Sequence, residues 1–430
     1  MTQPTTIAVI GLGYVGLPLA VEFGKHYPVI GYDISLERVN ELKRGEDHTL
    51  EADLTGLRQV LNTSQPTHST GLTLTNDAKD LSAANVFIVT VPTPIDKFNT
   101  PDLTPLLNAS RTIGRVLKKG DIVIYESTTY PGCTEDDCVP VLEQASGLRF
   151  NIDFFCGYSP ERINPGDKVN TLTKIRKITS GSTPDVALRI DALYNSILEN
   201  GTYRAPSIKV AEAAKAVENS QRDVNISFMN ELALICDRVG IDTLDVLEAA
   251  ATKWNFLPYR PGLVGGHCIS VDPYYLAHKA KMLGYEPQVI LSGRAVNNSM
   301  AKFIADKTLK LLIRKGYAIL HTRVLILGVT FKENCPDIRN TKVVDIAREL
   351  QDFGCQVDIY DPWADPSEVQ HELNATLIPK VNPDTPYKAI IACVAHNEFR
   401  HFDFARYKQQ GCVIFDVKGT IPRHLSDARL

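Results

Sequence analysis

The chain has 430 residues, too many for one ordinary hydrophobic core, so two or three domains are expected. Its 44% hydrophobic and 22% charged residues are typical of a soluble globular protein. A formal net charge of −4 without a long basic run argues against nucleic-acid binding. A few lysines, arginines and backbone amides could still bind a diphosphate.

The nine cysteines are odd in number and lack paired spacing, which predicts neither a metal site nor a disulfide framework. Reduced thiols in the cytoplasm fit this pattern best. The apolar stretch 7–21 is broken by glycines and a proline and follows no basic residue, so it does not resemble a signal peptide. No apolar run is long enough to span a bilayer, and no membrane partner is expected.

The first part of the chain alternates β-rich runs with helical stretches, which predicts an N-terminal Rossmann-type domain over residues 1–206 with a parallel sheet. The expected strands are Thr6–Ile10, Val29–Asp33, Val86–Val91, Asp121–Glu126, Phe154–Ser159 and Arg176–Gly181.

The next part, residues 207–315, is expected to be a central helical domain. Val210–Val239 lacks proline and glycine and carries apolar residues at helical spacing, and Gly240 is a plausible stop. Asp242–Ala251 and Ser292–Arg314 are two further expected helices. A helix of about 30 residues usually bridges domains or packs against another subunit, so we expect a homodimer or a higher homo-oligomer.

The last part, residues 316–430, returns to the β pattern and predicts a second, Rossmann-like α/β domain. It has no GxGxxG turn, so its ligand should differ from that of the first domain. Its expected strands are Val324–Val329, Val357–Tyr360, Ala389–Val394 and Val413–Val417. The predicted fold class is α/β, with a long connecting helix in the middle.

Gly11, Gly13 and Gly16 follow the first expected strand and open a helix. This spacing predicts a dinucleotide turn, although three glycines could also serve only a tight βα connection. Asp33 at the end of the second strand would accept the ribose hydroxyls and repel a 2′-phosphate, which favours NAD over NADP. Arg38 nearby weighs against that preference.

Cys268 follows two glycines and His267 in a segment rich in turn formers, Pro258–Gly266. A free cysteine is most often a small buried apolar residue. On a loop it could instead be a nucleophile, provided that a nearby cation favours the thiolate. His267 is adjacent in sequence, but neighbouring side chains often diverge, so it is not assigned as the base.

Other candidate residues are polar side chains at helix spacing or at strand ends. Lys215 and Asn219 are four residues apart on the long helix, where they could support an oxyanion or form a solvated face. Glu161 and Thr128 follow expected strands, where parallel sheets place ligand sites, but both could be ordinary cap or turn residues.

Taken together, the motifs resemble the nucleotide-sugar 6-dehydrogenase family, of which UDP-glucose dehydrogenase is the best-known member. The similarity covers essentially the whole chain. The motifs that carry it, in family order, are Gly11-Leu12-Gly13-Tyr14-Val15-Gly16-Leu17-Pro18, Glu126-Ser127-Thr128, Ser159-Pro160-Glu161-Arg162, Ala214-Lys215 with Asn219, Gly265-Gly266-His267-Cys268 with Asp272, and Phe331-Lys332 with Asp337 and Arg339.

The resemblance implies two successive oxidations of a sugar C6 hydroxyl by NAD, with Cys268 forming a thiohemiacetal and then a thioester. It assigns oxyanion support to Lys215 and Asn219, proton handling to Asp272, a base to Glu161 and water positioning to Thr128. The implied cofactor-binding residues are Gly11, Gly13, Tyr14, Val15, Gly16, Asp33, Arg38, Thr90, Thr128 and Arg339. The implied substrate-binding residues are Glu161, Arg162, Lys215, Asn219, Tyr259, Arg260, Gly265 and Lys332. UDP would bind the C-terminal domain, and the active site would lie in the cleft between the two α/β domains.

The chain departs from the UDP-glucose branch at two accessory positions. Pro165 stands where that branch has a second glutamate, and Val271 stands where it has a lysine. Glu161 would therefore carry more of the base role. The motifs around Glu161 and Cys268 resemble the branch acting on UDP-N-acetylhexosamines, especially the bacterial UDP-N-acetylglucosamine 6-dehydrogenases of capsule and O-antigen synthesis.

Alternatives remain for both substrate and activity. UDP-N-acetylgalactosamine is a close rival substrate, and UDP-N-acetylmannosamine and UDP-glucose are less favoured. A two-electron hydroxyacid-type dehydrogenase would need no thiol, and a non-catalytic NAD sensor would not need Lys215, Asn219, Cys268 and Asp272 together.

Overall fold

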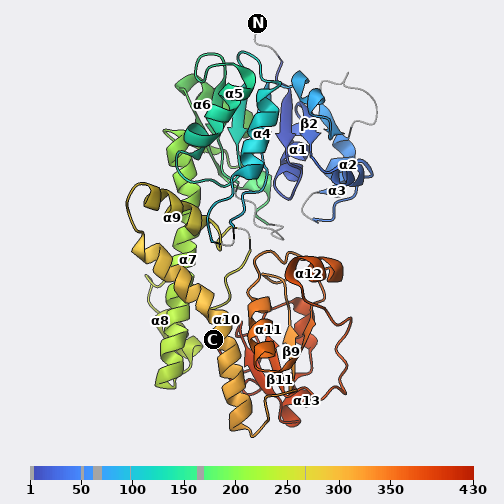
Figure 1. Ribbon diagram of the computed structural model, residues 1–430, viewed down its shortest axis with the longest axis vertical. Coiled ribbons are helices and arrows are strands. Elements are labelled where there is room, and N and C mark those ends of the chain that lie inside the picture. Colours follow the sequence, from blue (N-terminus) through green and yellow to red (C-terminus); the bar gives the residue numbers. More distant parts are fainter. Residues whose placement is uncertain (1–3, 50–52, 62–69, 97, 162–168, 267) are drawn as a thin grey trace. The chain divides into compact units, whose positions relative to one another are not determined.

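The computed structural model describes residues 4–49, 53–61, 70–96, 98–161, 169–266 and 268–430. The chain divides into two compact units, which are described separately. The N-terminal unit comprises Met1–Glu218 and Tyr274–Tyr285, and the C-terminal unit comprises Asn219–Pro273 and Glu286–Leu430 (Figure 1). None of the helices in the described ranges is both long enough and apolar enough to cross a bilayer.

The N-terminal unit contains an eight-stranded sheet with the strand order β3-β2-β1-β4-β5-β6-β7-β8. Its strands are β1 (Ile7–Ile10), β2 (Pro28–Tyr32), β3 (Gly71–Thr75), β4 (Val86–Val89), β5 (Ile122–Tyr125), β6 (Phe155–Tyr158), β7 (Lys177–Gly181) and β8 (Thr202–Arg204). In the register, Ile7 pairs with both Val29 and Val86. The order reverses between β1 and β4, which is where parallel α/β sheets bind ligands.

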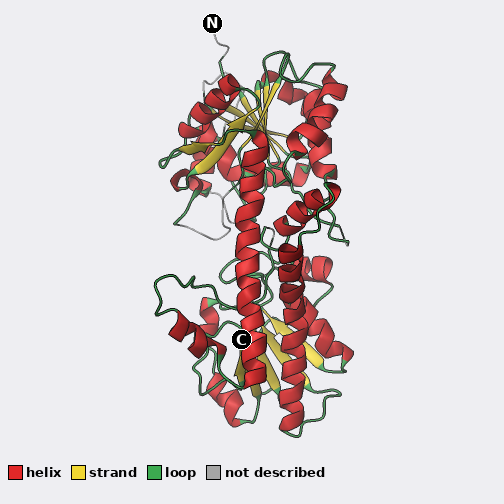
Figure 2. Ribbon diagram, turned by 90° about the vertical axis from the view of Figure 1, so that its left-hand side faces the viewer, coloured by secondary structure: helices red, strands yellow, loops and turns green. Residues whose placement is uncertain are grey.

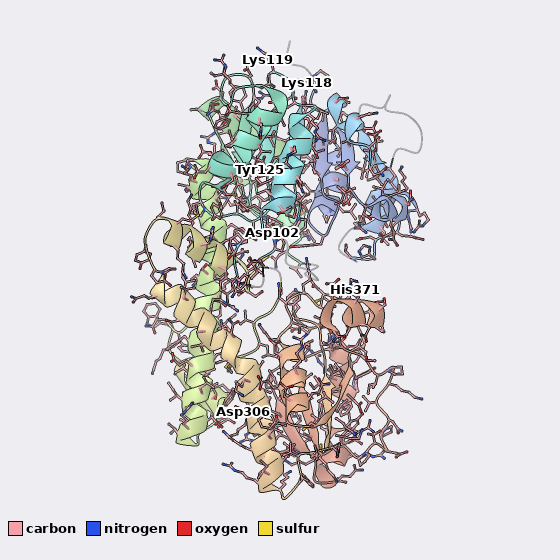
Figure 3. All side chains as sticks on the ribbon, viewed as in Figure 1. Asp102, Lys118, Lys119, Tyr125, Asp306 and His371 are labelled. Atoms are coloured by element: carbon pink, nitrogen blue, oxygen red, sulfur yellow. The ribbon has the colours of Figure 1, made fainter. Side chains whose placement is uncertain are left out.

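Helices cover both faces of this sheet. Ile7, Ile88 and Ile124 point to the face that packs against α1 (Gly16–Gly24), α2 (Leu36–Lys43), α3 (Leu54–Val60) and α6 (Pro184–Asn195). Tyr125 points to the other face, where its hydroxyl lies 2.7 Å from the Ser110 hydroxyl of α4 (Thr104–Gly114) (Figure 3). Helix α4 packs against α5 (Val139–Ser146). The short helical elements are η1 (Ala78–Ala83), η2 (Thr134–Cys138) and η3 (Leu172–Lys174).

Helix α7 (Ile208–Val239) has 32 residues, and the division between the two units falls within it, after Glu218. The remaining helices of the middle part are α8 (Thr243–Ala250), α9 (Asp272–Met282) and α10 (Gln288–Arg314). Asp242 caps α8, because its carboxylate accepts the N–H groups of Leu244 and Asp245.

The C-terminal unit contains a five-stranded parallel sheet in the order β10-β9-β11-β12-β13. One face packs against α10 and α11 (Val343–Asp352), and the other against α13 (Phe404–Gln409) and η4 (Asn397–His401). Figure 2 shows the strands of this sheet enclosed between helices. The strands are β9 (Arg323–Leu327), β10 (Gln356–Tyr360), β11 (Ala389–Ala392), β12 (Val413–Asp416) and β13 (Ala428–Arg429), and the remaining helix is α12 (Pro366–Leu373).

The predicted α/β class and the long helix are confirmed. Expectations at the sheet edges were less accurate. Strand β7 runs antiparallel to β6, so the expected parallel pairing does not hold for this strand. A parallel connection needs a crossover of a dozen or more residues, usually a helix, and the described part of this connection contains only η3. Strands β3, β8 and β13 and helix α9 were not predicted. The domain boundaries after residues 206 and 315 stay predictions.

Candidate active site

The first candidate site is the turn between β1 and α1, which carries the three glycines of the predicted fingerprint. Gly11 has a φ of +94°, a region that favours glycine, and its N–H donates to the Tyr32 carbonyl at 2.9 Å. A Cβ on Gly16 would lie 1.9 Å from the Gly11 carbonyl oxygen, so the start of α1 requires glycine there. Gly13 is exposed, and a Cβ there would meet nothing within 4 Å. The backbone at this helix N-terminus is thus open to a pyrophosphate.

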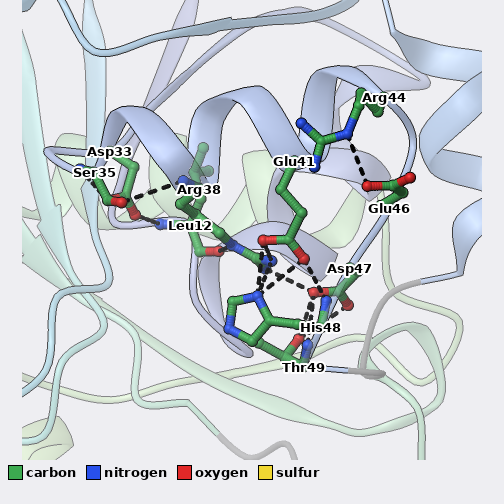
Figure 4. A network of polar contacts seen from close by, with 10 residues as sticks. All are labelled: Leu12, Asp33, Ser35, Arg38, Glu41, Arg44, Glu46, Asp47, His48 and Thr49. Atoms are coloured by element: carbon green, nitrogen blue, oxygen red, sulfur yellow. Dashed lines mark hydrogen bonds and ion pairs between the residues drawn. The ribbon is translucent and has the colours of Figure 1, made fainter.

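Asp33 lies beside this turn, directly after β2 (Figure 4). Its Oδ2 accepts the N–H of Leu12 at 2.9 Å, and its Oδ1 accepts the N–H of Ser35 at 2.9 Å. The side chain is half-buried, and each carboxylate oxygen has a further lone pair to offer. The residue can therefore hold the turn and still accept a ribose hydroxyl.

Arg38 supports the same turn from α2 (Figure 4). It is 7% exposed, and its Nε donates to the Leu12 carbonyl at 3.0 Å. Its terminal nitrogens donate to Asp47 at 2.7 Å and to Glu41 at 3.0 Å. Burial raises the pKa of Glu41, but hydrogen bonds from His48 and Arg38 outweigh it and hold that pKa below the ordinary value. Because carboxylates already compensate the guanidinium, its arrangement favours NAD over a 2′-phosphorylated dinucleotide.

Four further expected cofactor residues lie in this turn or after β4 and β5. Thr90, after β4, donates its hydroxyl to the Gly11 carbonyl at 2.7 Å. Tyr14 and Val15 lie half-buried in the turn itself. Thr128 lies half-buried after β5, three residues beyond the end of the strand.

Glu161 and Lys215 lie together in the N-terminal unit. The Lys215 Nζ donates to the Glu161 carbonyl at 2.8 Å and lies 3.7 Å from its Oε2. Lys215 is 3% exposed and Asn219 2% exposed, so the alternative of a solvated helix face is wrong for both residues. A buried ammonium next to a buried carboxylate is an arrangement that can stabilise a developing oxyanion and exchange a proton.

A buried ion pair supports this loop and was missed in the sequence. Lys177 of β7 is 1% exposed and donates to Glu126 at 2.6 Å and to the Pro160 carbonyl at 3.3 Å. The Tyr194 hydroxyl also donates to Glu126. The pair fixes the residue that precedes Glu161. The sequence offers no signal for this pair, because Lys177 begins a strand of mixed composition, Lys-Ile-Thr-Ser-Gly.

Glu212 was missed as well. It lies on α7, one turn before Lys215, and is fully buried. Its carboxylate accepts the N–H groups of Gly132 at 2.6 Å and Thr134 at 2.9 Å, and the Thr134 hydroxyl at 2.7 Å. Burial raises its pKa to about 7, although these donors pull in the opposite direction. The residue ties the segment after Thr128 to the helix that carries Lys215.

The second candidate site is the cysteine loop of the C-terminal unit. Cys268 is half-buried, whereas the other eight cysteines are buried. A Cβ on Gly265 would lie 2.8 Å from the Asn340 carbonyl oxygen. Gly266 has a φ of +82° and donates its N–H to the Arg339 carbonyl at 3.0 Å. Two adjacent positions therefore require glycine, which explains the composition of the motif before the thiol.

Asn219 and Asp272 accompany Cys268 in this unit. Asp272 begins α9, is 1% exposed, and donates its N–H to the Cys268 carbonyl at 2.8 Å. The Asn219 amide donates to the Asp272 Oδ2 at 2.6 Å. Asn219 thus orients the carboxylate nearest in sequence to the thiol. The proline directly after Asp272 was the overlooked signal for the helix start.

Lys332 lies in a pocket at the carboxyl ends of β9 and β11, where the strand order of the second sheet reverses. Gly265 lines the same pocket, and so do Lys342 and Lys418, which the sequence analysis missed. Three lysines around one pocket offer ammonium donors suited to a diphosphate.

The remaining expected residues are more dispersed. Tyr259 is half-buried and Arg260 exposed in the segment before the cysteine loop. Arg339 is ion-paired with Asp337, its Nε donating at 2.9 Å, and its own carbonyl accepts the Gly266 N–H. Arg162, Pro165 and His267 lie outside the described residues.

Three family models match successive parts of the chain. They are described as the NAD binding domain, the central domain and the UDP binding domain of the UDP-glucose/GDP-mannose dehydrogenase family, and they cover residues 5–198, 209–299 and 325–423. The resemblance and the NAD cofactor predicted from the motifs are thereby confirmed. A nucleotide sugar is the supported class of substrate. The roles of the individual site residues stay predictions.

Individual proteins show the same similarity. The chain is 54% identical over 427 residues to the UDP-N-acetyl-D-glucosamine 6-dehydrogenase of Pseudomonas aeruginosa, covering 99% of each chain. It is 52% identical to the enzyme of the same name from Salmonella typhi, covering 99% of this chain and 98% of that one. The solved structure of UDP-D-ManNAc dehydrogenase from Pyrococcus horikoshii matches with a TM-score of 0.88 and 30% identity, covering 99% and 98% of the two chains.

Proposed function

Because this chain belongs to the UDP-glucose/GDP-mannose dehydrogenase family, we propose that it oxidises the C6 hydroxyl of UDP-N-acetylglucosamine to the uronic acid. The observation that carries the choice of sugar is the 54% and 52% identity, over nearly the full length, to two proteins named UDP-N-acetyl-D-glucosamine 6-dehydrogenase. The choice of sugar is made within the class of NAD-dependent nucleotide-sugar dehydrogenases.

The turn around Gly13 and Asp33 fits the dinucleotide, because it offers open backbone at a helix N-terminus and a carboxylate for the ribose. When bound, NAD supplies the hydride acceptor for each of two oxidations. The residues of the chain then have to bind and orient the sugar, move protons and retain the aldehyde between the two steps.

Cys268 is proposed to retain the aldehyde. The first oxidation converts the C6 alcohol to an aldehyde with loss of two electrons. The Cys268 sulfur adds to that carbonyl carbon, and the carbonyl oxygen takes a proton, giving a thiohemiacetal. Loss of a second hydride from C6 and of the hydroxyl proton gives a thioester. Water then adds, and the Cys268 thiol leaves as the acid forms. Sulfur suits this series of reaction steps because it is both a strong nucleophile and a good leaving group.

The polar residues would assist in two groups. In the C-terminal unit, Asp272 would take the thiol proton. The Asn219 Nδ2 lies 2.6 Å from the Asp272 Oδ2 and would orient this carboxylate. In the N-terminal unit, Lys215 would stabilise oxyanions, and Glu161, 3.7 Å from its ammonium, would act as the base for water held by Thr128.

The UDP group is proposed to bind the pocket of Lys332, Lys342 and Lys418. Ammonium groups bind phosphate oxygens through charge-assisted hydrogen bonds. Tyr259 and Arg260 are proposed to cover the sugar nucleotide from the preceding segment.

An NADH assay over UDP-glucose and the three UDP-N-acetylhexosamines with gluco, galacto and manno configuration tests the substrate. We expect UDP-N-acetylglucosamine to have the highest kcat/KM and two NADH to form per sugar consumed. One NADH per sugar would indicate a two-electron dehydrogenase, and no NADH from any sugar would indicate an NAD sensor. A preference for UDP-glucose would refute the assignment to the N-acetylhexosamine branch.

The Cys268→Ala variant tests the covalent step. It should lose uronate formation while still binding NAD, and full retained turnover would reject the thioester.

By the resemblance, the product would enter surface polysaccharide synthesis. We also propose that the enzyme works in the cytoplasm, where its cysteines stay reduced, and assembles as a dimer through α7. Sedimentation as a monomer at micromolar concentration would reject the dimer.

A further inference from the structure

Gly262 is held on both sides of its peptide backbone by one side chain. It is buried six residues before Cys268, outside any helix or strand. Its N–H donates to the Asn230 Oδ1 at 2.8 Å, and its carbonyl accepts from the Asn230 Nδ2 at 3.0 Å. Buried backbone groups need hydrogen-bond partners. In this loop the side-chain amide of Asn230 on α7 supplies the partners that a neighbouring strand would supply in a sheet.

A chain of hydrogen bonds fixes which way the Asn230 amide points. The Asp223 carboxylate can only accept, so Asn297 must turn its Nδ2 toward it, at 2.7 Å. The Asn297 Oδ1 then faces Asn230 and accepts its Nδ2 at 2.8 Å. The Asn230 Oδ1 is thereby left for the Gly262 N–H. The Arg294 guanidinium compensates the charge of the Asp223 carboxylate, and its Nη1 lies 2.6 Å from the Asp223 Oδ1.

This clamp and the contacts of Gly266 are the two anchors of the cysteine loop. Gly266 is held by the Arg339 carbonyl and by the Asn340 amide, each at 3.0 Å. A shift of Gly262 would break its two hydrogen bonds to the Asn230 amide. The Asn230 amide therefore helps to fix the segment that leads into the cysteine loop.

We infer that Asn230 is a positioning residue of the reaction, which acts through Gly262 on the thiol of Cys268. The inference rests on the proposed covalent chemistry. A misplacement of about 1 Å at a reacting group can lower a rate about a hundredfold, so loss of the clamp should reduce kcat much more than it changes KM.

The Asn230→Asp variant is the main test, because it keeps the shape of the side chain, replaces the donor nitrogen by an oxygen and adds a negative charge when it is ionised. We expect kcat to fall at least about tenfold, with KM for the sugar nucleotide within about threefold of the parent value. We also expect iodoacetamide to alkylate Cys268 more slowly in the absence of substrate. Peptide mapping measures the extent of alkylation at Cys268. This readout is selective, because the other eight cysteines are buried.

The pH profile of Asn230→Asp separates positioning from a general loss of structure. Once protonated, the new carboxyl can donate to the Gly262 carbonyl while still accepting its N–H. The charged groups that face this position are Asp223 on α7 and Arg294 on α10. The deficit in alkylation rate should therefore be smaller at pH 6 than at pH 8.

Glu231→Gln is the matched control, since Glu231 is the exposed neighbour on the same helix, and it should keep both rates within about twofold. If Asn230→Asp does not fold, Asn230→Ala, which adds no charge, is measured in the same way. Unchanged alkylation of the folded fraction in both variants would overturn the inference in favour of a purely structural amide. Retained turnover of Cys268→Ala would instead refute the proposed chemistry, whatever the Asn230 variants do.

Discussion

The glycine turn allows its structural and cofactor roles to be separated by two alanine substitutions. At Gly16 the new Cβ would lie 1.9 Å from the Gly11 carbonyl oxygen, against the 3.4 Å at which ordinary contact begins. The obstructing atom is backbone and cannot rotate away. Overpacking typically costs about 1–3 kcal/mol, and here we expect the upper end. For a unit of this size, about 3 kcal/mol corresponds to a Tm lower by roughly 6–12 °C.

At Gly13 the expectation is reversed. A Cβ there meets nothing within 4 Å, and the residue does not have a positive φ, so Gly13→Ala should change stability by less than about 1 kcal/mol. A methyl group would nevertheless occupy the space through which a pyrophosphate approaches the backbone. We expect NAD affinity to fall at least about tenfold, or about 1.4 kcal/mol.

The assay combines thermal unfolding without ligand and calorimetric titration with NAD for both variants. Gly16→Ala should unfold at a clearly lower temperature, and Gly13→Ala should unfold normally but bind NAD poorly. Normal NAD binding by Gly13→Ala would show that the dinucleotide does not use this turn. An unchanged Tm for Gly16→Ala would show that the packing at the start of α1 is not as tight as described.

The other predictions concern a buried acid, the lysine pocket and cofactor choice. Burial raises the pKa of Glu212 to about 7, above its usual 4.5, so the folded state binds more protons and this group's contribution to stability falls as pH rises from about 4.5 through 7. In urea unfolding at pH 5 to 8, the stability of the parent protein relative to Glu212→Gln should therefore fall by about 2–3 kcal/mol, and a constant difference would contradict the raised pKa. Lys418→Met should weaken UDP binding about tenfold without affecting NAD, whereas Lys310→Met, at an exposed site on α10, should leave UDP binding unchanged. Asp33→Asn should lower the preference for NAD over NADP about tenfold in competition binding, and an unaltered ratio would remove Asp33 from the ribose site.

The sequence was most informative where a backbone requirement dictates the residue type. Gly11 and Gly16 stand where a positive φ and a close helix approach demand glycine, so their spacing alone located the turn. Lys418 could not be found in this way. Its association with Lys332 depends on the strand order of the second sheet, which brings together loops far apart in sequence. The edge strand β8 has only three residues, too few for a periodic pattern.

Buried polar networks were equally inaccessible. Nothing in the residues around Lys177 indicates that it pairs with Glu126, because the partner comes from another strand. The Asn230 clamp is a similar case, since an asparagine on a long helix ordinarily suggests only an exposed position. Such contacts become predictable only once the relative placement of the elements within each unit is known.

The two α/β parts build their first turns in the same way, although only one has the glycine fingerprint. Gly11 and Gly328 have φ values of +94° and +87°. Each donates its N–H to the last residue of the neighbouring strand, at 2.9 and 2.8 Å. An aspartate follows that strand in both parts, Asp33 in one and Asp361 in the other, and each accepts an N–H from its turn.

The two aspartates differ in what their oxygens already bind. Asp33 is half-buried and accepts two N–H groups, whereas the side chain of Asp361 is fully buried. Asp361 is engaged by Val329, Thr330 and His396 at Oδ2 and by Trp363 and Ala364 at Oδ1. Burial raises the pKa of Asp361, but the hydrogen bond and charge of His396 and the backbone donors outweigh it and hold that pKa below its usual value. A ribose hydroxyl could reach this carboxylate only by displacing those donors, each of which would then be buried and unpaired. The second α/β part therefore retains the shape of a dinucleotide turn without its ribose acceptor, which gives a physical reason why the NAD binding domain model matches the first part and a different model matches the second.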